Sequence, residues 1–265
     1  MYLETVDSAS SKPSCSVSKI FGGVLAVDDV SFAAPMGNIC ALIGPNGAGK
    51  TTLFNVATNL YEPSSGEVCV FGESVAGLQS HEVAARGVVR TFQTARVFPG
   101  MTTLENILAG AYLHVRASTT SQMLWRRSAR REERDLVRKA EALLEVTRLQ
   151  ALRDFAATDL PIGAQKLVEV LRALMANPKL LLLDEPAAGL NGHETAELSA
   201  LLRAIRDAGI SIVVVEHNMS LVMGVADIIF VLDAGKVIAS GGPEEIQQNP
   251  KVIEAYLSRP EGQPA

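Results

Sequence analysis

The stretch from Ile39 to Thr52 reads ICALIGPNGAGKTT, and it decides the fold of this 265-residue chain. Its first five residues form a short apolar run, which is typical of a strand buried on both faces of a parallel sheet. The next nine contain the eight-residue pattern G-x-x-x-x-G-K-[ST], in which a glycine-rich loop joins a strand to a helix, followed by one more threonine. They are Gly44, Pro45, Asn46, Gly47, Ala48, Gly49, Lys50, Thr51 and Thr52. The stretch therefore predicts a strand, a tight loop and a helix over Thr51–Asn59.

The residue types in this loop suit an anion. Glycines let successive backbone N–H groups turn toward phosphate oxygens, and the start of the helix adds the positive end of its dipole. Lys50 would be mildly unfavourable there by itself, but a bound triphosphate reverses the sign of the interaction. We expect Thr51 to place its hydroxyl on Mg²⁺ and Thr52 to contact the α-phosphate side. The alternative is a glycine-rich turn with an exposed lysine.

Three more apolar runs indicate neighbouring strands, at Val88–Phe92, Leu180–Leu183 and Ile212–Val215. Segments with helical spacing lie between them, at Gln165–Ala176 and Glu194–Ala208. Strands buried on both faces need helices on both sides, so the pattern predicts a doubly wound α/β core. Antiparallel additions are expected from strands at Val17–Val30 and Gly66–Phe71, and from a hairpin of Ile228–Leu232 with Lys236–Ala239.

The predicted domain organisation rests on a long segment that has no apolar runs typical of strands. From about Thr102 to Arg153 the pattern is helical and highly charged, which predicts a helical subdomain over about 94–160 inserted in a domain spanning 15–258. Residues 1–14 and 259–265 are expected to be flexible tails. The basic run over 126–138 fits either a solvated helix face with interspersed glutamates, or a surface for lipid headgroups or membrane subunits.

Composition excludes several classes of function. Hydrophobic residues make up 48% of the chain and charged residues 20%, a globular balance. The net charge of −5 gives no basic field for nucleic acid. Cys15, Cys40 and Cys69 have no metal-ligand spacing and are expected to be reduced. The start lacks a secretory signal, and the apolar stretch Leu221–Leu232 is too short to span a membrane, so we expect a cytoplasmic chain.

Polar residues follow the predicted core strands at the edge where ligands sit in doubly wound sheets. We expect Asp184 to hold Mg²⁺ through water, and Glu185 to orient and polarise a water that attacks the γ-phosphate. His217 could hydrogen-bond the γ-phosphate and that water, and Gln93 could reach the metal ion or the water. Taken singly, the acidic pair could start a helix, the histidine could be structural, and the glutamine is uninformative. Glu216 is expected to have a structural or supporting role.

In their order along the chain, these motifs resemble the ABC ATPase family from about Val17 to Ser258. The resemblance implies a P-loop NTPase (RecA-like) doubly wound core with an antiparallel β subdomain and an inserted α-helical subdomain, using ATP and Mg²⁺. The matching segments are the phosphate loop, the Q-loop at Gln93, the Walker B strand Leu180–Asp184 with Glu185 as base, the D-loop Ala188–Asn191 and the switch His217. Phe21 matches the aromatic that stacks on adenine.

The family signature, usually Leu-Ser-Gly-Gly-Gln, falls at Leu160-Pro161-Ile162-Gly163-Ala164. In the family this segment binds the γ-phosphate of ATP held by a second cassette, so the resemblance implies nucleotide contacts from Leu160, Gly163 and the D-loop Asn191. Pro161 departs from the pattern, because it has neither a hydroxyl nor a backbone N–H. Gly163 and the helix start can still offer N–H groups. The departure suggests unequal sites, and hence a heterodimer with a second ABC ATPase subunit.

Within the family, the chain looks most like the longer ATPase subunit of bacterial branched-chain amino acid importers. The stretches that suggest it are RTFQ at Arg90–Gln93, DEPAAGLN at Asp184–Asn191, EHNMSLVMG at Glu216–Gly224 and NPKVIEAYL at Asn249–Leu257. This implies two transmembrane permease subunits, indirectly a periplasmic or lipid-anchored solute-binding protein, and a peripheral place on the cytoplasmic face of the inner membrane. Alternatives are an ABC exporter subunit for lipid or lipopolysaccharide and a non-transport ABC ATPase. A P-loop kinase or GTPase lacks support, since no N-K-x-D motif is present.

Overall fold

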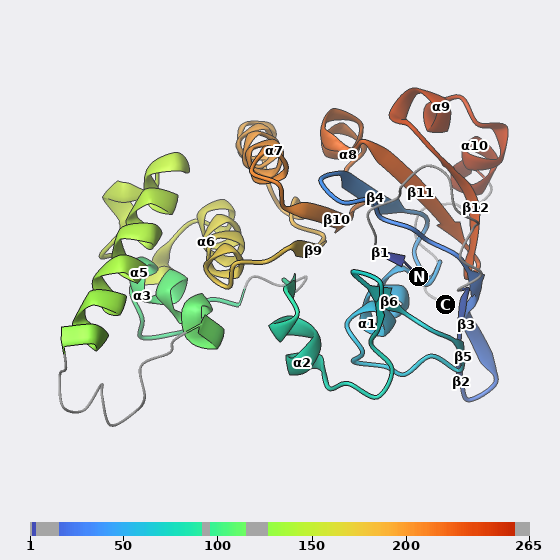
Figure 1. The fold of residues 1–265 in the computed structure, drawn as a ribbon. Helices are drawn as coiled ribbons and strands as arrows, with labels where there is room; N and C mark the ends of the chain where they lie inside the picture. Colours follow the sequence, from blue (N-terminus) through green and yellow to red (C-terminus); the bar gives the residue numbers. More distant parts are fainter. Residues whose placement is uncertain (1, 4–15, 92–95, 115–126, 258–265) are drawn as a thin grey trace. The chain divides into compact units, whose positions relative to one another are not determined.

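The computed structural model describes residues 2–3, 16–91, 96–114 and 127–257 (Figure 1). The chain divides into two compact units. The first consists of Met1–Arg90, Lys179–Ala188 and Leu202–Ala265, and the second of Thr91–Pro178 and Gly189–Leu201.

A six-stranded sheet forms the core of the first unit. Its order is β12 (Lys236–Gly241), β11 (Ile228–Asp233), β4 (Ile39–Ile43), β10 (Ser211–Val215), β9 (Leu180–Asp184) and β8 (Val88–Arg90). All neighbours are parallel except β11 and β12. Every residue of β4, β9 and β10 is buried, as expected for strands covered on both faces. The prediction of an α/β core built on these apolar runs is confirmed.

The strand register brings the functional segments to one edge of the sheet. Val215 at the end of β10 pairs with Asp184 at the end of β9 on one side and with Leu42 of β4 on the other. Because parallel strands share a direction, the residues that follow all three strands emerge at the same edge. The phosphate loop follows β4, Glu185 follows β9, and His217 lies two residues beyond β10.

Helices of the first unit are short. They are α1 (Lys50–Ala57), α2 (Ser80–Ala85), α8 (Met219–Val225), α9 (Pro243–Gln247) and α10 (Pro250–Leu257). Phe54 of α1 is fully buried in the hydrophobic core together with Leu42 of β4 and Leu182 of β9. This packing fixes the helix that follows the phosphate loop against the sheet.

Two small three-stranded sheets complete the first unit. One has β2 (Val17–Phe21) between β3 (Val24–Val30) and β5 (Ser65–Gly66), and the other has β6 (Cys69–Val70) between β1 (Tyr2–Leu3) and β7 (Glu73–Ser74). The prediction of one strand over Gly66–Phe71 is therefore wrong, since the segment is shared between two sheets. Gly66 ends the first piece with a φ of +79°, and a Cβ there would overlap the Ser16 carbonyl oxygen.

The second unit is helical. It holds α3 (Thr103–Leu108), η1 (Ala109–His114), α5 (Arg127–Val146), η2 (Gln150–Leu152), η3 (Ala157–Asp159), α6 (Ile162–Met175) and the first part of α7 (Gly192–Asp207). Thr102 and Glu105 form a capping box that starts α3. Gly110 lets η1 lie against α6, because a Cβ there would overlap the Arg172 carbonyl oxygen.

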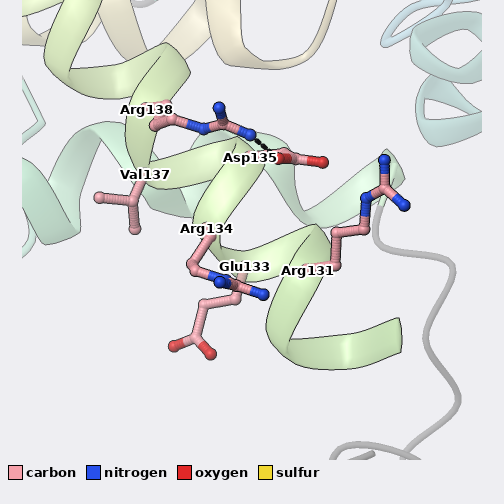
Figure 2. A pocket seen from close by; sticks show the side chains of 6 residues that line it. All are labelled: Arg131, Glu133, Arg134, Asp135, Val137 and Arg138. Atoms are coloured by element: carbon pink, nitrogen blue, oxygen red, sulfur yellow. Dashed lines mark hydrogen bonds and ion pairs between the residues drawn. The ribbon is translucent and has the colours of Figure 1, made fainter. Parts of the chain in front are cut away.

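The basic run carries acidic side chains between its arginines (Figure 2). A hollow of about 810 Å³ is lined by Arg131, Glu133, Arg134, Asp135, Val137 and Arg138 of α5. Arg138 forms an ion pair with Asp135 one turn away, which favours the interpretation of a solvated helix face. Within the described ranges, no helix has both the length and the apolar character needed to cross a membrane.

Candidate functional site

The phosphate loop requires glycine at two positions, for the same two steric reasons at each. Gly44 has a φ of +149° and Gly49 a φ of +100°, both of which favour glycine. A Cβ on Gly44 would overlap the Leu232 carbonyl oxygen, and one on Gly49 would overlap the Ala26 carbonyl oxygen. The loop is thus pressed against neighbouring backbone on one side, while Asn46 and Gly47 at its tip are exposed.

The turn between β11 and β12 supports the phosphate loop through backbone hydrogen bonds. The N–H of Gly235 donates to the carbonyl of Ala48 at 3.0 Å, and the N–H of Asp28 donates to the carbonyl of Gly235 at 2.9 Å. Pro45 and Thr52 are partly buried beside this framework, and Thr51 is exposed. A loop held in this way can present its remaining N–H groups without reorganising when an anion binds.

Lys50 is the cation of the loop. It is 8% exposed, and its Nζ donates to the carbonyl oxygens of Gly44 at 2.7 Å and Pro45 at 3.0 Å. Burial lowers the pKa of Lys50, and the charges of Glu185 and Asp184 partly oppose that shift. The first turn of α1 has no acidic residue, so no side chain there neutralises the positive end of the helix.

Asp184 is held by an arginine that the sequence analysis did not single out. Arg90 Nη2 lies 2.9 Å from Asp184 Oδ2, and the two side chains are 12% and 5% exposed. Arg90 Nη1 donates to Asn55 Oδ1 at 2.6 Å, and the guanidinium lies 5.6 Å from the centre of the Phe54 ring. The pairing arises because β8 lies beside β9, which residue spacing does not reveal.

Glu185 and His217 face one another across adjacent strand ends. Glu185 has a φ of +48°, and its N–H donates to the Val215 carbonyl at 2.9 Å. His217 Nδ1 lies 3.8 Å from Glu185 Oε2, and the histidine side chain is 62% exposed. A carboxylate and an imidazole at this spacing can share a water or a phosphate oxygen between them.

The oxygen ligands at this edge fit a magnesium ion. Mg²⁺ is usually bound by one or two carboxylates, hydroxyl oxygens and the phosphates of its substrate, and Asp184 and Thr51 offer the first two kinds. Among the described residues, no cluster of three or more His, Cys, Asp and Glu could hold a metal ion alone. Gln93, the other predicted ligand, lies outside the described residues.

Phe21 stands with a second aromatic residue. Its ring makes an edge-to-face contact with Tyr61 at 5.3 Å between centroids, and Lys19 Nζ lies 5.1 Å from its centre. Phe21 and Tyr61 are 40% and 39% exposed. Tyr61 was missed because it follows α1 in a turn, far in sequence from Phe21. Such a half-exposed pair offers an apolar face to a planar ring.

The predicted signature residues lie in the second unit, as does the D-loop apart from Ala188, which ends a segment of the first unit. Leu160 and Gly163 are buried and Pro161 precedes the first turn of α6. A Cβ at Gly163 would overlap the Glu194 carboxylate, so a larger residue there would displace that side chain. Asn191 caps α7, since its Oδ1 accepts the N–H groups of His193 and Glu194 at 2.9 and 3.0 Å.

Comparisons with known proteins agree with this geometry. A family model described as "ABC transporter" matches residues 27–188, and one described as "Branched-chain amino acid ATP-binding cassette transporter" matches residues 236–257. The chain is 41% identical to the high-affinity branched-chain amino acid transport ATP-binding protein BraF of Pseudomonas aeruginosa, over 89% of this chain and 93% of that protein. It has the same identity and coverage with LivG of Escherichia coli K12.

Solved structures resemble about nine tenths of the chain. A nucleotide-free ATP-binding cassette from an ABC transporter aligns with a TM-score of 0.77 and 34% identity, covering 91% of this chain and 96% of that one. The cassette MJ1267 in its ADP conformation aligns with a TM-score of 0.78 and 33% identity, covering 92% and 97%. The similarity therefore extends over both compact units.

Proposed function

Because the chain belongs to the ABC transporter family, as an ATP-binding subunit that is an ATPase, we propose that it powers an importer. The proposed cargo is branched-chain amino acids or related small polar solutes. The observation that carries the proposal is the match of residues 236–257 to the branched-chain amino acid cassette family, together with relatives named for that transport. This match favours import over the exporter and non-transport alternatives.

The proposed hydrolysis uses residues that the sheet brings to one edge. The phosphate loop and Lys50 bind the β- and γ-phosphates, while Phe21, from the smaller sheet of β2, β3 and β5, stacks on the adenine. Glu185 orients and polarises the attacking water, and His217 hydrogen-bonds that water and the γ-phosphate. The 3.8 Å separation of Glu185 and His217 supports their acting on one water.

Asp184, Thr51 and Gln93 are proposed to hold Mg²⁺ with the nucleotide. The ion, when bound, neutralises charge that develops on the phosphate oxygens. The buried carboxylate of Asp184 and the hydroxyl of Thr51 support this assignment, as both are hard oxygen ligands.

The proposed assembly pairs this chain with a second ABC ATPase subunit on two transmembrane permease subunits, at the cytoplasmic face of the membrane. A solute-binding protein would deliver the cargo. Leu160, Gly163 and Asn191 are proposed to contact the nucleotide of the partner cassette. Pro161 supports a heterodimer, because its missing N–H would weaken one of two composite sites.

Two variants test the proposed chemistry in the complex with its permease subunits. Glu185→Gln should nearly abolish steady-state ATP hydrolysis while ATP binding persists, because the water loses its orienting carboxylate. Lys50→Ala should lose nucleotide affinity, measured by titration with a fluorescent ATP analogue. Unchanged turnover in Glu185→Gln would remove Glu185 from this role. Failure of every branched-chain amino acid and related small polar solute to stimulate hydrolysis, in the importer assembled with its solute-binding protein, would refute the cargo.

A further inference from the structure

A buried carboxylate at the end of β10 has no task in the mechanism described above. Glu216 is 0% exposed, and burying a charge is costly unless hydrogen bonds replace the lost water. Three backbone N–H groups do so. Ala187 donates to Oε1 at 2.6 Å, and His217 and Asn218 each donate to Oε2 at 3.0 Å.

The three donors belong to the two segments that carry the proposed chemistry. Ala187 lies two residues after Glu185, in the tight turn closed by the hydrogen bond from the Ala188 N–H to the Glu185 carbonyl at 3.2 Å. The other two donors are His217 itself and its neighbour. One carboxylate thus joins the turn behind Glu185 to the backbone of His217.

Glu185 needs such support because its backbone is strained. A non-glycine residue with a φ of +48° lies in the left-handed region, where its Cβ crowds the backbone and which L residues rarely adopt. Its own N–H is held by the Val215 carbonyl at 2.9 Å, one residue before Glu216. The end of β10 therefore holds the strained residue on one side and the turn after it on the other.

We propose that Glu216 is a positioning residue, which ties the Glu185 turn to the His217 segment and so fixes the separation of the two side chains for hydrolysis. The inference rests on the proposed roles of Glu185 and His217. A carboxylate suits the task because it accepts on both oxygens and donates on neither. A glutamine would turn its NH₂ group toward at least one N–H donor, and an aspartate is one methylene too short to span both segments.

The test compares Glu216→Gln with the wild-type chain in the permease complex. A displacement of about 1 Å in an active site costs on the order of a hundredfold in rate. We therefore expect kcat to fall by about tenfold to a hundredfold, while KM for ATP and the affinity for a fluorescent ATP analogue stay within about threefold of wild type. Glu216→Asp keeps the charge and should also lose turnover, because it cannot reach Ala187.

Asp227→Asn is the matched control. Asp227 also accepts a backbone N–H, from Ile39 at 2.7 Å, but at the start of β4, the opposite edge of the same sheet. This variant should keep kcat even if its melting temperature falls.

Three results would overturn the inference. The first is a wild-type kcat in Glu216→Gln, and the second is a Glu216→Gln protein that is less stable but turns over each bound nucleotide at the wild-type rate. The third is a loss of kcat in Asp227→Asn equal to that in Glu216→Gln. If Glu216→Gln does not fold, Glu216→Asp decides the question by the same criteria, and failure of both to fold would mark the residue as structural only. Loss of hydrolysis in Glu185→Gln with none in Glu216→Gln would leave the proposed function intact.

Discussion

Replacing Arg90 by methionine should destabilise the first unit much more than replacing an exposed arginine. The change removes the 2.9 Å ion pair to Asp184, whose side chain is only 5% exposed, and the 2.6 Å hydrogen bond to Asn55. Methionine keeps part of the packing against the Phe54 ring. Removing one partner of a buried ion pair costs about 3 to 5 kcal/mol, because the remaining charge is left without compensation. We expect about 3 kcal/mol, since Lys50 supplies some positive charge nearby.

The assay is urea unfolding followed by circular dichroism. With a slope of about 2 to 3 kcal/mol per molar urea, the loss corresponds to a midpoint lower by about 1 to 1.5 M. Arg86→Met is the control, because Arg86 pairs with Glu73 at 3.3 Å on the surface, where the side chains are 34% and 72% exposed. Such a pair is worth at most about 1 kcal/mol. The double variant Arg90→Met/Asp184→Asn should recover most of the stability.

The reasoning fails if Arg90→Met unfolds within about 1 kcal/mol of Arg86→Met, or if the double variant is no more stable than Arg90→Met. Either result would mean that the Arg90–Asp184 pair does not compensate the buried carboxylate. A lower slope alone would be different evidence, because it reports a change in the surface exposed on unfolding.

Two further predictions follow from the phosphate loop and the core. Gly49→Ala should weaken binding of a fluorescent ATP analogue by more than tenfold, because the new Cβ would overlap the Ala26 carbonyl oxygen. Gly77→Ala is the control and should not weaken binding, since Gly77 also has a positive φ but has open space around it. Equal effects of the two changes on the affinity would show that the overlap with Ala26 is relieved at little cost. Burial raises the pKa of Cys40 to about 12 from 9.0. As the pH rises above 9, the thiol therefore ionises in the unfolded chain while it stays neutral in the folded chain. Ionisation then stabilises the unfolded state, and the free energy of unfolding falls. At pH 10 the loss in free energy of unfolding amounts to about 1.4 kcal/mol. Cys40→Ala should therefore lose less stability between pH 8 and 10 than wild type. If the free energies of unfolding of the two chains fall in parallel over this range, the raised pKa of Cys40 is contradicted.

Strand identity and strand-end chemistry could be predicted because each depends on residues close in sequence. An apolar run such as Leu180–Leu183 that stops on Asp184 specifies a buried strand and its functional end together. The error at Gly66–Phe71 has the opposite origin. Which of two sheets each half joins depends on partners far along the chain, such as Val17 for Gly66 and Tyr2 for Cys69.

The supporting contacts could not be predicted for a related reason. Arg90 meets Asp184 only because β8 pairs with β9 in a register that places Arg90 opposite Leu182. Tyr61 meets Phe21 across a turn and a small sheet. The local sequence shows which residue types are present, but the strand register determines which of them are in contact.

The contacts at the sheet edge also explain how a highly charged ligand can bind there. Lys50 is satisfied by two loop carbonyls, Asp184 by Arg90, and Glu185 lies beside His217. A triphosphate that binds Lys50 in place of the two carbonyls therefore replaces the hydrogen-bond partners that this buried ammonium group already has. In the proposed site, where Asp184 holds a cation brought with the nucleotide, that cation must compete with Arg90 for the Asp184 carboxylate. It follows that Arg90→Met, although less stable, should gain more stability from MgATP than the wild-type chain does.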